Sequence, residues 1–275
     1  MAITAADVGK LRKMTGAGMM DCKKALTEAD GDFDKAIEII RKKGQSVANK
    51  RADRDATEGV VLAKVSEDGK SGAVVVLNCE TDFVAKNESF VDITRSILDV
   101  AVENLPADLD ALKALELNGS TIKDLVIEQV GVIGEKIELS YYGKINAETV
   151  VAYIHQGNKL ATLVGFNQAG FDVQAGKDVA MQVAAMNPVA VSRDAVPADV
   201  KEKELEIGKE MARNEGKPEA MLDKIAQGRL NKYFKENVLL EQAFVKDNKT
   251  TIAKHLQGVD KDLTVTEFIR FSLDS

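Results

Sequence analysis

Tryptophan is absent from the 275-residue sequence, and cysteine and histidine occur only twice each. Cys22 and Cys79 are too few and too far apart for a disulfide framework or a site built from several thiolates. With only His155 and His255, a zinc enzyme would have to use carboxylate ligands, and a serine or cysteine nucleophile would have two candidate bases. We therefore expect no catalytic residue, cofactor or bound metal, and the sequence does not predict an enzyme.

Long apolar runs and aromatic residues are also scarce. No apolar run is longer than that of residues 73–77, which is far shorter than the ~20 residues that span a membrane. Met1 is not followed by a basic and then apolar secretion signal, so we expect a cytoplasmic protein that does not bind membranes. Aromatic residues make up 5% of the chain and the net charge is -7. This composition disfavours nucleic-acid binding, which usually combines a basic face with stacking rings.

What remains is the composition of a globular α+β protein of about two domains, 45% hydrophobic and 29% charged. The first 54 residues show the spacing of three short helices. Thr4 and Asp7 fit a capping box, and the first helix should end at residues 15–16. Residues 16–18 should form a turn, after which Asp21 is a candidate cap for the second helix.

The third helix is predicted to carry its apolar residues between positions 33 and 40 and to end at the basic residues 41–43 and Gly44. From there to about residue 58 large apolar residues are nearly absent. We interpret this segment as a linker that is helical in part.

Beyond the linker the hydrophobic period changes to that of strands. Residues 59–65 and 73–79, joined by a polar turn at 67–70, predict a β-hairpin. A helix should follow over about 88–102, then helical stretches near 108–117 and 121–133 and a strand at 136–145. These elements form the expected first half of a core, residues 59–145.

The hairpin and helix then return, with strands at 149–155 and 160–167 and a helix over about 177–186. Residues 74–78 align with 163–167, and we interpret the two units as an old internal duplication. A last strand at 263–273 should complete the second half of the core, which we assign to residues 146–198 and 238–275.

Residues 199–237 interrupt this second half. Lysine and glutamate dominate them, with a thin apolar stripe and a break at 214–218. The pattern predicts two antiparallel helices that project from the body, and two ordinary surface helices are the alternative.

Two local features carry possible function. The adjacent Met19 and Met20 point about 100° apart on a helix, so both cannot easily enter one small core and one is expected to be exposed. Between a core role and a partner surface, the pattern alone favours the core role. Phe83 stands beside Asp82 directly after a predicted strand. Its ring either folds back onto the core or is held outward to enter something else, and the residues alone leave both open.

No phosphate-binding loop is present in the sequence. Gly16, Ala17 and Gly18 are not followed by the Gly-Lys-Ser/Thr of such loops, and the segment before them is helical where a strand is required. We do not expect the chain to bind a nucleotide by itself.

The segments TGAGMMDCKKAL at residues 15–26 and NCETDFVA at residues 78–85 closely resemble the two signatures of the bacterial elongation factor Ts family. The similarity continues through residues 153–155, 228–229 and 268–271, so it covers nearly the whole chain. The resemblance implies a guanine-nucleotide exchange factor for elongation factor Tu. It also implies a helical domain similar to ubiquitin-associated domains at residues 1–54, a two-part α+β core and an inserted helical hairpin.

The resemblance also assigns roles to residues. Asp82 and Phe83 match the pair that enters beside the nucleotide site of elongation factor Tu, near the switch II helix, and disturbs the Mg²⁺ there. Thr81 and Val84 match the residues that hold this loop.

Four further residues match positions in contact with the partner. Arg12, Met19 and Met20 match positions that pack on a helix of the GTPase domain of elongation factor Tu. His155 lies in the core half that faces another of its domains. Some family members extend past the last strand into a further helical module, and here we expect no contact of that kind because the sequence ends at Ser275.

The expected partner is elongation factor Tu in its GDP-bound and nucleotide-free forms, with GDP released until GTP binds. Two alternatives are an RNA-binding adaptor that uses the basic residues between 41 and 54, and an adaptor that recognises ubiquitin-like folds without exchange activity. A hydrolase or transferase is disfavoured because the sequence lacks a set of nucleophile and base.

Overall fold

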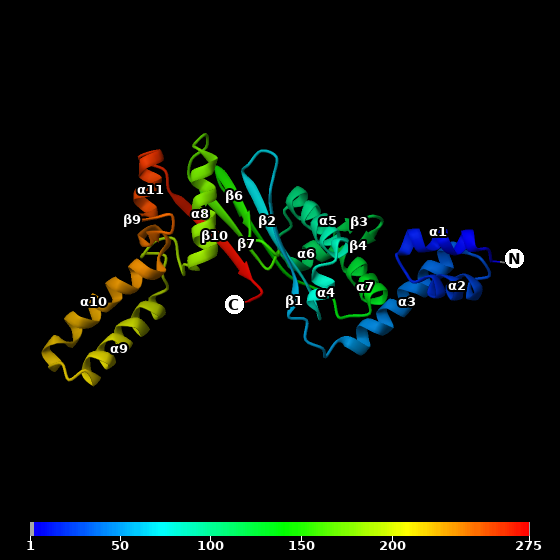
Figure 1. The fold of residues 1–275 in the computed structure, drawn as a ribbon, viewed down its shortest axis with the longest axis horizontal. Coiled ribbons are helices and arrows are strands. Elements are labelled where there is room, and N and C mark those ends of the chain that lie inside the picture. Colours follow the sequence, from blue (N-terminus) through cyan, green and yellow to red (C-terminus); the bar gives the residue numbers. More distant parts are fainter. Residues whose placement is uncertain (1–2, 275) are drawn as a thin grey trace.

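The computed structural model describes residues 3–274 and confirms the α+β fold (Figure 1). Three helices at the N-terminus form one end of an elongated molecule, and a long pair of helices projects near the other end. Two antiparallel three-stranded sheets lie between them, with helices packed on their outer sides. Within residues 3–274, none of the helices is both long and apolar enough to cross a membrane.

The first helix, α1 (Ala5–Thr15), begins at the predicted capping box. The Thr4 hydroxyl accepts the N–H of Asp7, and the Asp7 carboxylate accepts the N–H of Thr4. Gly16 then ends the helix in the left-handed conformation, with φ of 68°.

The second helix, α2 (Met19–Glu28), begins earlier than Asp21 would allow. Its N-cap is Gly18, so the predicted cap at Asp21 is wrong. Asp21 lies instead in the first helical turn, where a carboxylate interacts favourably with the helix dipole. It also pairs with Lys43 of the third helix. The side chains buried in the small core between these helices include Leu11, Cys22 and Leu26.

The third helix, α3 (Phe33–Arg51), does not end at Gly44 as predicted, and the first half of the expected linker is helical. Gly44 is buried against α7 (Ile122–Ile133), which packs along α3. Burial on α7 stabilises helical backbone that has few large apolar residues of its own, and this tertiary contact overrides the weak local signal.

The first sheet has the order β1-β2-β5, formed by β1 (Glu58–Val65), β2 (Ser71–Cys79) and β5 (Glu138–Asn146). The predicted hairpin is therefore confirmed. The central strand β2 is buried on both faces. Val75 and Leu77 face the cluster that includes α5 (Glu88–Asn104), and Val74 and Val76 face the second sheet. Two-sided burial explains why residues 73–77 are continuously apolar.

Between α5 and β5 the chain forms α6 (Leu109–Ala114), the short strands β3 (Glu116–Leu117) and β4 (Ser120–Thr121), and α7. The two helices were predicted, but the small hairpin was not. Two-residue strands are too short to show a hydrophobic alternation in sequence.

The second sheet has the order β10-β7-β6, formed by β6 (Thr149–Ile154), β7 (Leu160–Phe166) and β10 (Val265–Ser272). As in the first sheet, the second strand of the hairpin is central and pairs with a later strand. Helix α8 (Val173–Met186) covers this sheet and begins four residues before its predicted start. The shared order agrees with the interpretation of a duplication, which stays an interpretation.

The long pair consists of α9 (Ala198–Asn214) and α10 (Glu219–Asn237), which run antiparallel and project from the body as predicted (Figure 1). The chain then returns through the 3₁₀ turn η1 (Leu239–Glu241), β8 (Ala243–Phe244), β9 (Asp247–Thr251) and α11 (Ile252–Val259) before β10. The sequence pattern had not indicated these small elements.

Candidate partner-binding site

The segment that follows β2 folds into a single helical turn, α4 (Asp82–Ala85), with Thr81 at its N-cap. Val84 and Ala85 pack against the core under the first sheet. Because neighbouring residues on a helix point about 100° apart, the inward placement of Val84 turns Phe83 away from the core. Of the two alternatives that the sequence left open, the structure shows the ring held outward.

Phe83 is 83% exposed. Among residues 3–274 it is the one exposed side chain of the phenylalanines and tyrosines. Transfer of a phenylalanine ring from water to an apolar environment is worth roughly 1.5–3 kcal/mol. An exposed ring on a helical turn therefore contributes none of this free energy to the stability of the isolated chain. The ring is available to bind a partner.

Asp82, at the first position of α4, pairs with Lys86 across one helical turn, with 2.6 Å between Oδ2 and Nζ. The hydrogen bond from Lys86 lowers the pKa of Asp82 below its usual value. The carboxylate is therefore ionised at neutral pH and stands next to the exposed ring.

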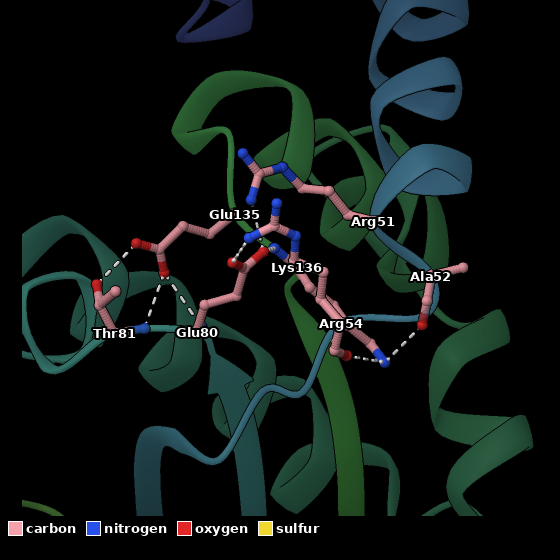
Figure 2. Close-up of polar contacts among 7 residues, drawn as sticks. All are labelled: Arg51, Ala52, Arg54, Glu80, Thr81, Glu135 and Lys136. Carbon is pink, nitrogen blue, oxygen red and sulfur yellow. Dashed lines mark hydrogen bonds and ion pairs between the residues drawn. The ribbon is translucent and has the colours of Figure 1, made fainter.

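Glu135, just past the C-terminus of α7, anchors the start of this segment (Figure 2). Its Oε2 accepts the N–H groups of Glu80 at 3.1 Å and of Thr81 at 3.0 Å, and its Oε1 accepts the Thr81 hydroxyl at 2.7 Å. Hydrogen bonds to an ionised acceptor are among the stronger ones in proteins. The 81–84 segment is thus attached to a distant part of the chain through its backbone as well as its side chains.

Glu80 forms a second set of contacts, shown beside the first in Figure 2. Its Oε1 accepts from the N–H of Lys136 at 2.6 Å and from Arg51, the last residue of α3, at 2.7 Å. Arg54 lies 3.6 Å from Oε2. The hydrogen bond from Lys136, and then the contacts with Arg51 and Arg54, lower the pKa of Glu80.

The Lys136 side chain completes this arrangement by donating to the carbonyls of Ala52 and Arg54, at 3.0 and 2.9 Å (Figure 2). The chain that leaves α3 is therefore fixed to the base of the 81–84 segment rather than hanging free. Only part of the predicted linker behaves as a connection without regular structure.

Cys79, the last residue of β2, is fully buried and donates from Sγ to the Thr81 carbonyl at 3.2 Å. Burial, followed by the negative charge of Glu135, raises the pKa of this thiol to about 12. Since the thiolate is the nucleophilic form, Cys79 is a structural contact and not a reactive group.

Met19 and Met20 are both exposed, at 53% and 65%, so the core role that the pattern favoured is wrong. The buried face of α2 is formed by Cys22, Ala25 and Leu26, which leaves the first two positions of the helix outside. Arg12 is exposed on α1.

His155 is exposed in the turn between β6 and β7, where its Nδ1 lies 2.8 Å from the Tyr153 hydroxyl. The candidate residues thus lie on three parts of the molecule: the N-terminal helices, the loop after β2 and the second sheet. They are not gathered into one cavity, which is the arrangement expected for contact with a large partner.

Comparison with known proteins identifies the family. Residues 80–275 match the family model described as elongation factor TS. The protein named elongation factor Ts from Amoebophilus asiaticus is 57% identical over 272 residues, which cover 98% of each chain. Its counterpart from Porphyromonas gingivalis is 53% identical over 276 residues and the full length of both chains, and that from Bacteroides thetaiotaomicron is 43% identical over 99% of each.

The chain belongs to the elongation factor Ts family. Members of this family are nucleotide exchange factors for elongation factor Tu in translation elongation and are not enzymes, so this is the function of the chain. Membership also implies elongation factor Tu as its partner.

Within this member of the elongation factor Ts family, the sequence indicated the 81–84 segment but not the side chains from distant parts of the chain that hold it. Glu135 and Arg51 are 54 and 29 residues away from their partners in the segment and its base. A glutamate before a strand and an arginine in a basic run carry no local signal of such contacts. Only the folded chain brings them to Glu80 and Thr81.

Proposed function

We propose that the 81–84 segment is the part of this exchange factor that enters beside the nucleotide of elongation factor Tu. In this proposal Phe83 and Asp82 disturb the Mg²⁺ and phosphate site, Thr81 and Val84 hold the loop, and GDP is released until GTP binds. The observation that carries the proposal is the exposed Phe83 ring on a helical turn whose other face is packed on the core.

The chemistry of the partner makes the metal a sensible target. A GTPase holds GDP through backbone amides, a lysine and Mg²⁺, and the ion is bound by a few oxygen ligands and waters. Displacing the ion loosens the phosphates. By linkage, the exchange factor lowers the affinity of elongation factor Tu for GDP by the same factor by which GDP lowers its affinity for the exchange factor.

Phe83 alone cannot supply the binding free energy needed to release GDP from elongation factor Tu. Burying its ring provides roughly 1.5–3 kcal/mol, and each tenfold change in affinity needs about 1.4 kcal/mol. One ring therefore accounts for about one to two powers of ten. Most of the binding energy has to come from other surfaces. The 81–84 segment then converts a part of that energy into strain at the metal.

We assign those surfaces to the N-terminal helices, through Arg12, Met19 and Met20, and to the second sheet, through His155. The chain would use them on GDP-bound and nucleotide-free elongation factor Tu in the cytoplasm, with no cofactor and no direct nucleic-acid contact. The proposed parts are residues 1–54 with a linker to about 58, residues 59–145, residues 146–198 with 238–275, and the inserted pair 199–237.

The RNA-binding alternative draws no support from the basic residues between 41 and 54. Arg41 pairs with Glu128 at 2.7 Å, and Arg51 and Arg54 both lie against Glu80. Arginines already paired with carboxylates are poorly placed to neutralise phosphates.

The test is the release of a fluorescent GDP from purified elongation factor Tu at saturating exchange factor. Phe83→Ala should lower the maximum release rate about 10- to 100-fold, in line with the free energy of the buried ring. The thermal midpoint should not fall, because the ring is exposed. Met221→Ala, which removes an exposed apolar side chain on α10, is the control and should leave the rate unchanged. An unchanged maximum rate in Phe83→Ala would show the assignment to be wrong.

A further inference from the structure

Helix α7 contacts the N-terminal helices, and Glu135, just past the C-terminus of α7, contacts the base of the 81–84 segment. Along its length it packs on α3, where Arg41 donates to Glu128 at 2.7 Å and to the Ser120 hydroxyl at 2.5 Å. Its last turn approaches the turn between α1 and α2, since a Cβ placed on Gly16 would lie 3.9 Å from Val132. The turn that precedes Met19 therefore lies near the C-terminal end of α7.

The same end of α7 leads directly to the 81–84 segment. Gly134 ends the helix in the left-handed conformation, with φ of 79°. The next residue, Glu135, is half-buried and accepts three hydrogen bonds from Glu80 and Thr81. One short stretch of chain thus supports two of the three surfaces that we assign to the partner, the N-terminal helices and the 81–84 segment.

The contacts of Glu80 close this arrangement. Its N–H is held by Glu135, while its carboxylate receives the backbone N–H of Lys136 and the side chain of Arg51 at the end of α3. The end of α3, the end of α7 and the start of the 81–84 segment therefore form a closed set of contacts, visible together in Figure 2.

We propose that Glu135 is a positioning residue for nucleotide exchange, through which α7 keeps the 81–84 segment in a fixed relation to the N-terminal helices. This inference rests on the proposed role of Phe83. A loop that is ordered before binding does not lose conformational freedom in the complex. More of the binding free energy is therefore available to disturb the metal site. Small misplacements of a reacting or inserting group cost large factors in rate.

Without Glu135, the segment would keep the packing of Val84 and the contact of Cys79 with the Thr81 carbonyl. It would lose the hydrogen bonds that tie the N–H groups of residues 80 and 81 to the chain just after α7. Binding through the N-terminal helices should persist, because the packing of α3 on α7 does not involve Glu135.

The experiment measures GDP release from elongation factor Tu over a range of exchange-factor concentrations for Glu135→Ala and Glu135→Gln. Glu135→Ala should lower the maximum rate about tenfold, and by no more than Phe83→Ala does, while the half-maximal concentration changes little. Glu135→Gln keeps one acceptor oxygen, and its maximum rate should lie between those of Glu135→Ala and the parent. Glu103→Ala, which removes an exposed carboxylate on α5, is the control and should match the parent.

The Phe83→Ala background separates a positioning role from a general loss of structure. If Glu135 acts through the 81–84 segment, Glu135→Ala should have no further effect on the maximum rate in that background. An equal fall in both backgrounds, or no fall in either, overturns the inference. Should Glu135→Ala fold poorly by circular dichroism, Thr81→Val removes one of the three donors and should give about a two- to threefold fall that is again absent with Phe83→Ala.

The two proposals fail in different ways. If Phe83→Ala leaves the maximum rate unchanged, the proposed role of the 81–84 segment is wrong. If Phe83→Ala lowers the rate and neither Glu135→Ala nor Thr81→Val does, only the role of Glu135 is wrong.

Discussion

Gly44 of α3 and Gly131 of α7 face each other where the two helices cross, and a Cβ added to Gly131 would lie 2.8 Å from the Cα of Gly44. The backbones are in contact at this point, and no side chain larger than hydrogen fits between them. Ridges of ordinary side chains would hold two helices 8–10 Å apart. The orientation of the N-terminal helices on the core therefore depends on two glycines 87 positions apart in sequence.

Gly131→Ala should destabilise the protein although alanine is the better helix former. The added methyl group meets backbone, which cannot move aside, and overpacking of this kind costs typically about 1–3 kcal/mol. Gly228→Ala in α10 is the matched control, since its Cβ would meet nothing within 4 Å and the helix should gain about 0.5–1 kcal/mol. Denaturant unfolding of both variants measures the free energies, and equal gains in stability would contradict the close crossing.

Glu80→Gln should change how stability depends on pH. The contacts of Glu80 lower its pKa in the folded protein below the ordinary value of 4.5. Its charge therefore stabilises the fold fully above about pH 4.5, and this contribution disappears as the pH falls through the lowered pKa. At pH 7 the variant should be less stable by about 1–3 kcal/mol, and the difference from the parent should shrink below pH 4.5. Urea unfolding between pH 3 and 7 measures it, and a constant difference over this range would rule out the ionised contact.

Met19→Ser and Met20→Ser should affect binding and not stability. Both side chains are exposed, so the free energy of unfolding should change by no more than about 0.5 kcal/mol. If they meet elongation factor Tu, each should weaken its affinity by about 1–2 kcal/mol. Leu26→Ala, in the core under the same helix, is the opposite case and should lose about 2–5 kcal/mol of stability. Calorimetric titration with elongation factor Tu and thermal unfolding separate the two effects.

Cys79 should resist alkylation in the native protein at pH 8. Burial raises the pKa of its thiol to about 12, so almost none of it is the reactive thiolate at that pH. Glu135→Ala should make Cys79 react faster, because residues 80 and 81 lose their hydrogen bonds to Glu135 and a negative charge that raises the pKa of the thiol is removed. Cys22, buried between the N-terminal helices, is the internal control and should stay unreactive in both proteins. Peptide mass spectrometry after iodoacetamide treatment resolves the two sites, and rapid native labelling of Cys79 would contradict the structure.

Features that depend on a few neighbouring residues could be predicted from the sequence. The capping box of Thr4 and Asp7, the stop at Gly16 and the two hairpins follow from patterns within short, continuous stretches of sequence. The end of α3 was predicted wrongly because its second half is held by α7, which lies far along the chain. The core role favoured for Met19 and Met20 was wrong because the helix buries a different face.

By itself, the amino-acid sequence determined the family, the order of most helices and strands, and the motif that contains Phe83. Motifs and hydrophobic periods can be recognised within short stretches of chain. Only the tertiary structure decided that the ring points outward and that Glu135, Glu80 and Arg51 hold its base. Hydrogen bonds between residues 54 or 29 positions apart require the packing of the hydrophobic core, which brings the strands and helices together. No local pattern encodes that Glu135 will accept the N–H groups of Glu80 and Thr81, because the packing of α3 and α7 brings these residues together.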